Sequence, residues 1–137
     1  MTKHSAHRPR QPLLHDALVT IAAPTQVWSR HTGDMVLPID GVYHADVRHM
    51  KDIRLTCGHS DIEWIGVTEV PTDVRDDVVV RTVVATGLLR DADNDDADPK
   101  LRLERSRTVR PGAIEETYTV ISRLADPVEL SFGLDVS

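Results

Sequence analysis

The chain carries many side chains that bind metal ions or transfer protons, with seven histidines and 22 acidic residues among its 137 residues. His31, His44, His49 and His59 fall within one short stretch. No pair of them has the spacing of a helical zinc motif, and the single cysteine, Cys57, has no second thiolate to join it. The residues therefore predict neither a metal site nor a bound cofactor.

One acidic segment partly matches a calcium-binding loop. Asp91, Asp93 and Asp95 have the spacing of the first three ligands of an EF-hand. The sixth position, where the sharp turn needs glycine, is Asp96, and the twelfth, where a bidentate glutamate closes the site, is Arg102. Without that turn and that ligand, we expect a solvated loop.

No pattern in the sequence marks a catalytic site. The chain lacks the Gly-x-Ser-x-Gly turn of serine hydrolases and a glycine-rich phosphate loop. Asp46, Glu63 and Glu69 lie in or near apolar β segments, but no neighbouring residue indicates a general acid or base. We predict strand-face or turn carboxylates, no catalytic residue, and a chain that is not an enzyme by itself.

Aromatic side chains supply flat apolar platforms for sugar rings, and they make up only 4% of this chain. Trp28 stands close to a turn at residues 32–34, which favours exposure, so it is a candidate glycan contact. Trp64 alternates with Ile62, which favours a core position, and is a second candidate. His44 completes the candidate set.

The elements that would position these side chains are predicted to be strands. Valine and threonine are abundant, and apolar residues repeatedly alternate with period two. We count about eight to nine strands and little helix. Residues 53–57 and 62–70 are predicted to form a hairpin, and residues 78–89 a central strand covered on both faces. The other predicted strands span 17–23, 26–31, 35–39, 101–110, 113–124 and 131–136.

One hairpin is predicted together with its register. Pro111 and Gly112 suit the two central positions of a turn, since proline fixes φ and glycine accepts the left-handed conformation. If these two residues form the loop, apolar side chains of the two strands face each other and so do opposite charges. A shift of the register by one residue would lose all of these pairs. The predicted pairs are Val109 with Ile114, Arg107 with Glu116, Arg105 with Tyr118 and Leu103 with Val120.

These strands predict an all-β fold, an antiparallel β-sandwich, because each sheet has an apolar face that a second sheet must cover. We expect a flexible lead-in at residues 1–12 and one domain over 13–137. The formal net charge of -6 argues against nucleic acid and anionic membranes as partners. No apolar run is long enough for a membrane span or a secretory signal, and the single cysteine is typical of a cytoplasmic protein.

The last predicted strand, with Phe132, Leu134 and Val136 on one face, runs up to the end of the sequence. Either this strand is the natural C-terminus or the sequence is part of a longer chain. An open strand edge invites pairing with another copy, so a homodimer through strand edges is a further hypothesis.

The most distinctive segment, residues 41–48, reads Gly-Val-Tyr-His-Ala-Asp-Val-Arg. It resembles the motif Gly-Leu-Phe-Tyr-Arg-Asp-Thr-Arg in the N-terminal domain of many bacterial glycogen-debranching enzymes of the amylo-α-1,6-glucosidase type. Gly41, Asp46 and Arg48 match that motif and Tyr43 is a conservative replacement, whereas positions 44, 45 and 47 differ. The similarity runs from about residue 12 to the end and includes residues 103–105, 109–112, 115–117 and 134–136.

The resemblance implies a β supersandwich that precedes an (α/α)6 barrel, and it is the barrel that carries the carboxylates for hydrolysis of α-1,6 branch points. A chain of 137 residues is too short to include that barrel. The resemblance therefore implies a non-catalytic domain whose partners are its own C-terminal barrel and an α-glucan such as glycogen. An independent carbohydrate-binding module and a self-association module are the alternatives.

Structural roles are expected for the motif residues. Gly41 allows a tight turn before a strand. Asp46 and Arg48 are two residues apart, so an extended chain puts them on one face, where a charge-assisted hydrogen bond between them would fix the loop. Tyr43 belongs to the same motif, and a sugar contact is the alternative role for this set.

Overall fold

The computed structural model describes residues 17–58, 61–89 and 100–137. The predicted lead-in at residues 1–12 and the acidic segment at 91–99 lie outside these ranges. The described chain has strands, turns and loops but no helix, and hence no helix that could cross a membrane. Its strands are β1 (Leu18–Ala22), β2 (Thr25–Ser29), β3 (Gly41–His44), β4 (Val47–Met50), β5 (Ile53–Cys57), β6 (Glu63–Glu69), β7 (Asp73–Arg75), β8 (Val78–Leu88), β9 (Leu101–Arg110), β10 (Ala113–Ser122) and β11 (Phe132–Val136).

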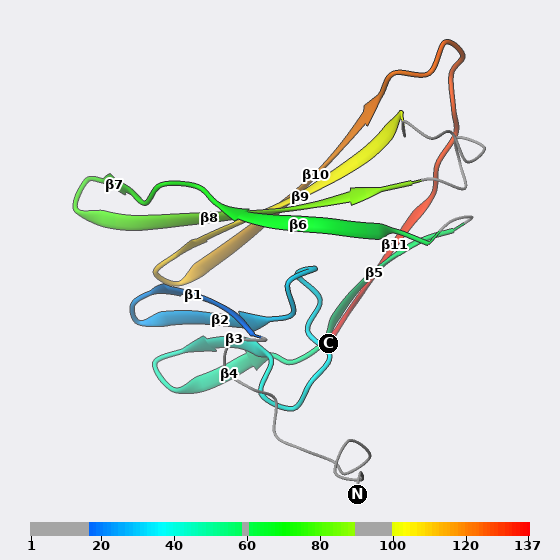
Figure 1. The fold of residues 1–137 in the computed structure, drawn as a ribbon. Coiled ribbons are helices and arrows are strands. Elements are labelled where there is room, and N and C mark those ends of the chain that lie inside the picture. The colour runs from blue at the N-terminus through cyan, green and yellow to red at the C-terminus, as the bar shows by residue number, and fades with distance from the viewer. Residues whose placement is uncertain (1–16, 59–60, 90–99) are drawn as a thin grey trace, which may run out of the picture.

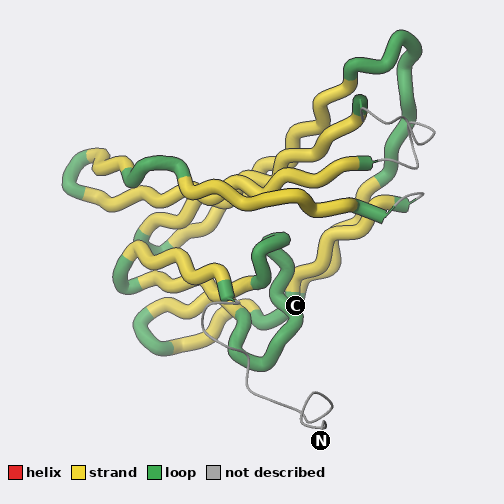
Figure 2. The backbone as a smooth tube through the Cα atoms, viewed as in Figure 1, coloured by secondary structure: helices red, strands yellow, loops and turns green. Residues whose placement is uncertain are grey.

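The strands form two layers that face each other (Figure 1). One layer is the sheet β10-β9-β8-β6, in which β7 also pairs with β8, and the other is the sheet β1-β2-β3-β4. β1 contacts β8 and β9, and β2 contacts β9. A third pair, β5 with β11, lies at one end of the layers, and loops join the elements (Figure 2). All of these pairs are antiparallel, which confirms the predicted sandwich-like fold.

Two apolar clusters fill the space between the elements. The first joins β2, β5 and β9 through Val27, Ile53 and Val109, all nearly inaccessible to solvent. The second joins β5 and β9 through Leu55 and Leu103. Burial of one such side chain contributes roughly 1.5–3 kcal/mol relative to exposure. The remaining members are Ala22 and Met35 in the first cluster and Leu89 and Leu101 in the second.

The hairpin of β9 and β10 has the register predicted from the sequence. Gly112 has a φ of 82°, the left-handed conformation that its place in the turn requires. In this register, apolar side chains of β9 face apolar side chains of β10, and opposite charges face each other. A shift by one residue would lose these pairs. The observed pairs include Val109↔Ile114, Arg107↔Glu116, Arg105↔Tyr118 and Leu103↔Val120.

The predicted hairpin of residues 53–57 with 62–70 is wrong. β5 pairs with β11 instead, and β6 pairs with β8. Alternation of apolar residues shows that each segment is a strand, but it carries no information about the partner. Phe132 faces Cys57 and Leu134 faces Leu55, so β11 offers β5 the same kind of apolar cross-strand pairs as a neighbouring segment would. The chain therefore leaves one sheet after β5 and enters another.

Two further predictions need correction. Residues 35–39 form no strand, and only Met35 makes an isolated bridge, to Ile53. Pro38 lacks the N–H that a ladder requires, and the chain turns there. β8 is central as predicted, but it is not covered on both faces: from Val83 onward the odd-numbered residues, including Ala85, are buried and the even-numbered ones are half-exposed, while Val80 is buried earlier in the strand.

Candidate functional site

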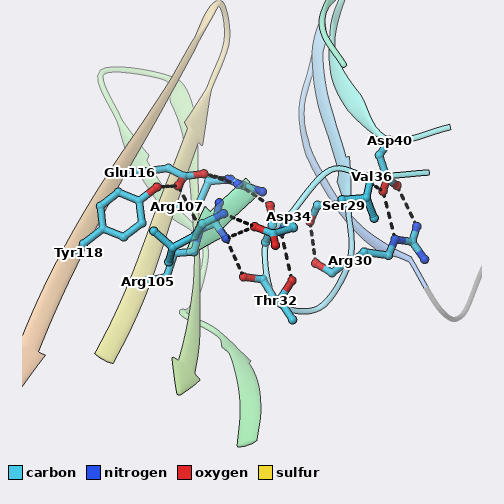
Figure 3. Close-up of polar contacts among 12 residues, drawn as sticks. Ser29, Arg30, Thr32, Asp34, Val36, Asp40, Arg105, Arg107, Glu116 and Tyr118 are labelled. Atoms are coloured by element: carbon cyan, nitrogen blue, oxygen red, sulfur yellow. Dashed lines mark hydrogen bonds and ion pairs between the residues drawn. The ribbon is translucent and has the colours of Figure 1, made fainter. Parts of the chain in front are cut away.

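A buried ion-pair network joins the two layers (Figure 3). Arg105 and Arg107 alternate on β9, and both reach Glu116 on the neighbouring strand β10. Arg105 Nε donates to Glu116 Oε1 at 3.1 Å, and Arg107 Nε donates to Glu116 Oε2 at 2.5 Å. The hydroxyl of Tyr118 also donates to Glu116 Oε1. One carboxylate thus accepts hydrogen bonds from three side chains, and two of these are cations.

The same arginines hold a loop that lies far away in the sequence. Arg105 Nη1 donates to Asp34 Oδ1 at 2.7 Å and to the carbonyl oxygen of Thr32 at 3.1 Å. Arg107 Nη2 donates to the carbonyl oxygen of Gly33 at 2.7 Å. Gly33 has a φ of 94°, and a Cβ there would lie 3.0 Å from Arg105 Nε. The close approach of the arginine and the left-handed backbone therefore both require glycine at position 33.

Charge balance keeps this network ionised. Burial alone raises the pKa of Glu116, but the positive charges of Arg107 and Arg105 outweigh it and lower the pKa. Burial lowers the pKa of Arg105, but attraction to Glu116 and the hydrogen bond to Asp34 raise it overall. For Arg107, burial prevails and the pKa is lowered. Because a general acid needs a raised carboxyl pKa, Glu116 is a structural anion.

A second buried carboxylate shapes the other end of the loop (Figure 3). Arg30 donates to Asp40 from Nη2 at 2.8 Å and from Nε at 3.1 Å, a bidentate pair. Asp40 Oδ2 also accepts the backbone N–H groups of Val36 and Leu37, each at 3.0 Å. Burial alone raises the pKa of Asp40, but the hydrogen bonds from Arg30 and the backbone lower it overall. The loop from Arg30 to Asp40 is thus fixed at both ends.

The motif at residues 41–48 continues from this loop as β3, a turn and β4. Arg48 Nη2 donates to the carbonyl oxygen of Asp40 at 2.5 Å, and its guanidinium lies 5.9 Å from the ring centroid of Tyr43. Asp46 has a φ of 68° and lies in the turn, so the expectation that an extended chain pairs it with Arg48 is wrong. Gly41 has a φ of 154°, and a Cβ there would be 2.5 Å from the carbonyl oxygen of Met50.

An open groove of about 380 Å³ lies over the outer face of β2 and β3. Gln26 faces Tyr43 and Trp28 faces Gly41 in the strand register, so the three side chains lie on the same face of the sheet. Trp28 Nε1 donates to Gln26 Oε1 at 3.1 Å, and the Tyr43 hydroxyl donates to the carbonyl oxygen of Ile39 at 2.7 Å. The groove is lined by Pro24, Gln26, Trp28, Ile39, Tyr43 and Asp46.

The groove offers aromatic and aliphatic surface together with a carboxylate and an amide. An aromatic ring presents an apolar face, and a carboxylate accepts hydrogen bonds from hydroxyl groups. That combination suits a sugar ring, which has an apolar face and a hydroxyl rim. Among the described residues, no three His, Cys, Asp or Glu side chains lie close enough together to hold a metal ion.

A family model described as the N-terminal domain of (some) glycogen debranching enzymes matches residues 21–137. The chain belongs to this family. Searches of curated proteins and of solved structures gave no match. The match spans both layers of this debranching-enzyme domain, including the loop, the motif and the groove.

Of the candidate glycan contacts, the debranching-enzyme domain brings Trp28 together with the motif residues Tyr43 and Asp46, but not with the other two candidates. Trp64 lies in the other layer, packed against the cluster of Leu55, and lines a separate depression. Sequence reasoning missed the contributions of Gln26 and Ile39 to the groove, because only the strand pairing and the loop bring them there.

His44 points to the opposite face of β3 from Tyr43, toward the β9–β10 turn. Its Nδ1 lies 2.9 Å from Thr25 Oγ1, which in turn accepts the N–H of Gly112 at 2.7 Å. His44 therefore helps to dock this turn on β2. In the debranching-enzyme domain it lines no part of the groove.

The alkaline stability of this debranching-enzyme domain should depend on Tyr118. Burial, followed by the hydrogen bond to Glu116 and its charge, raises the pKa of Tyr118 to about 12. The unfolded tyrosine ionises near its ordinary pKa, so the stabilisation is complete below about pH 10 and is lost as the pH rises toward 12. Partial exposure limits the loss to about 1 kcal/mol. Urea unfolding at increasing pH should show that the free energy of unfolding falls less steeply for Tyr118→Phe than for the unmodified chain. An equal fall for the two proteins would contradict this assignment.

Proposed function

We propose that this chain is a non-catalytic domain that supports a separate catalytic domain of the amylo-α-1,6-glucosidase type and binds α-glucan in the groove at Trp28. Membership of the debranching-enzyme family supports the first part. The carboxylates of Asp40 and Glu116 are held as anions by arginines, which suits a scaffold and not proton transfer. A cytoplasmic location belongs to this proposal, since Cys57 is a free thiol.

The observation that carries the glucan proposal is the meeting of Trp28, Tyr43 and Asp46 in one groove. The two aromatic residues come from neighbouring strands, and Asp46 comes from the turn that follows. A glucose ring stacked on Trp28 would bring its hydroxyl rim toward the Asp46 carboxylate and the Gln26 amide. The open shape of the groove suits a segment within a long glucan chain.

The ion-pair network contributes to this binding surface by fixing the loop behind it. Arg105 and Arg107 hold the loop near Asp34, and Asp40 closes its far end, so the position of Ile39 is determined by bonds on both sides. The carbonyl of Ile39 in turn orients the Tyr43 hydroxyl. A binding surface whose walls are fixed beforehand loses less entropy when it binds.

The groove is tested by affinity electrophoresis of the chain in gels containing glycogen. We expect retardation of the unmodified chain and much weaker retardation of Trp28→Ala, because an aromatic stacking contact worth about 1–3 kcal/mol corresponds to roughly a 5- to 150-fold change in affinity. Trp28→Phe should keep part of it. Ile65→Ala, which changes a side chain that is 56% exposed on β6, is the control and should migrate as the parent. An unretarded parent chain would disprove glucan binding.

The non-catalytic assignment is tested separately by assaying the purified chain on a branched α-glucan. We expect no release of glucose or of linear chains, because the buried carboxylates are neutralised by arginine. Hydrolysis by this polypeptide alone would contradict the non-catalytic assignment, whatever the result of the gel experiment.

A further inference from the structure

β11 is an edge strand with exposed apolar side chains. Residues that face each other in its pairing with β5 lie on the same side of the sheet. On that side Ile53 and Leu55 are buried, whereas Phe132, Leu134 and Val136 are 36%, 44% and 51% exposed. The apolar face of the β5–β11 pair is therefore covered over β5 and open over β11.

The backbone groups of the same three residues point away from β5. Asp52 and Ser137 exchange two backbone hydrogen bonds, of 3.0 and 2.9 Å, and Gly58 N donates to the carbonyl oxygen of Ser131 at 2.7 Å. Because such bonds alternate along an antiparallel strand, the odd-numbered residues of β11 point toward β5 and the even-numbered residues point outward. Within the described part of the chain, no strand pairs with that outward edge.

Two other strand edges, those of β6 and β4, carry features that oppose association. β6 has a register shift between Trp64 and Gly66, and β4 presents Arg48 within a strand of four residues. Bulges and cationic side chains at an edge prevent pairing with other chains. β11 has neither feature, and its one charged residue, Asp135, lies opposite Arg54 of β5.

We propose that the outward edge of β11 binds the same edge of a second copy of this chain, antiparallel and around a two-fold axis through Leu134. In this register Leu134 faces Leu134 of the second copy, and Phe132 faces Val136. Gly133 faces Asp135, so no like charges are directly opposed. Every outward N–H and C=O group of the strand then has a partner, as an isologous interface requires.

The sequence of β11 favours this register over its neighbours. With the axis at Asp135, the two Asp135 carboxylates would face each other, which is unfavourable. With the axis at Gly133, Val136 would face residue 130, which lies outside the strand. The strand is therefore complementary to itself in one register, and this self-complementarity identifies a second copy as its partner.

Size-exclusion chromatography with light scattering of the full chain tests the association. We expect the mass to rise with concentration toward twice the 15.3 kDa of one chain. Leu134→Lys should weaken dimerisation about tenfold or more, because two lysines would face each other at the axis. Val47→Lys places the same charge on β4, another edge strand, at a side chain that is 56% exposed, and should leave dimerisation unchanged.

Cross-linking tests the register and does not depend on the lysine variant folding. In a Cys57→Ser background, Leu134→Cys should form a disulfide-linked dimer on mild oxidation, since facing residues in a hydrogen-bonded pair lie about 5.5 Å apart. Phe132→Cys alone should form none, because it faces Val136. A monomer at all concentrations, equal dimerisation of Leu134→Lys and the parent, or cross-linking through Phe132→Cys in place of Leu134→Cys would each overturn the proposal.

Discussion

Glu116→Ala should lower the free energy of unfolding by about 3–5 kcal/mol, because it leaves two buried cations without their shared carboxylate. The Arg105 and Arg107 side chains are 1% and 7% exposed, so water cannot replace the lost partner. Nη2 of Arg105 already lacks a hydrogen-bond partner in the described structure. Urea unfolding followed by circular dichroism measures the change.

The neighbouring residue provides a matched control. Glu115 has the same side chain, but it is 65% exposed and its Oε1 lies 3.8 Å from Arg110 Nη2. Surface ion pairs of this kind contribute about 0–1 kcal/mol, so Glu115→Ala should be nearly neutral. If the free energy of unfolding fell by similar amounts for the two variants, burial of the Glu116 network would add no more to stability than a surface ion pair does.

Gly41→Ala should destabilise the chain by about 3 kcal/mol, since it combines backbone strain with a steric overlap. Gly41 has a φ of 154°, and a Cβ at this position would lie 2.5 Å from the carbonyl oxygen of Met50 and 2.9 Å from Arg48 Nε. The backbone oxygen cannot move without separating β3 from β4. Denaturant unfolding is again the measurement.

Gly66→Ala is the control for this substitution. A Cβ at Gly66 meets no atom within 4 Å, so alanine should change stability by no more than about 1 kcal/mol and in the stabilising direction. If Gly41→Ala were as stable as Gly66→Ala, the conformational reason for glycine at the start of the motif would be refuted.

The Gly41 variant and the Trp28 variant separate two roles within one region, the sheet of β2 and β3. Gly41 and Arg48 act on the backbone that joins the loop to β3, so changing them should reduce stability first. Trp28 is only half-buried and its indole N–H is bonded to Gln26, so changing it should reduce glucan binding while the fold persists. Measuring stability and retardation on the same variants distinguishes a structural motif from a binding one.

Prediction from the sequence succeeded where the interactions are local. The β9–β10 hairpin was predicted to the residue because Pro111-Gly112 specifies the turn and the flanking pairs allow one register. It failed for β5, whose partner β11 lies more than seventy residues further along the chain. Alternation identifies a strand but not its neighbour, so the pattern predicts a local partner where the structure has a distant one.

The candidate site shows the same division. The sequence supplied Trp28 as a candidate contact and residues 41–48 as a motif, but it did not place them together. The pairing of β2 with β3 puts Gln26 and Trp28 beside Tyr43, and the turn brings Asp46 to the same groove. The expected Asp46–Arg48 pair failed because positive φ at Asp46 ends the extended geometry on which it depended.

By itself, the sequence determined that this chain is a β protein, because alternation and turn residues act over a few positions. The family came from a different signal, the resemblance carried by the motif at residues 41–48, and the family-model match over residues 21–137 shows it. Only the tertiary structure decided that Arg105 and Arg107 hold a loop more than seventy residues away, and that this loop forms a wall of the groove. Burial makes such distant contacts strong, since charges removed from water must find partners within the protein. The choice among those partners depends on the packing of whole sheets, which no local pattern specifies.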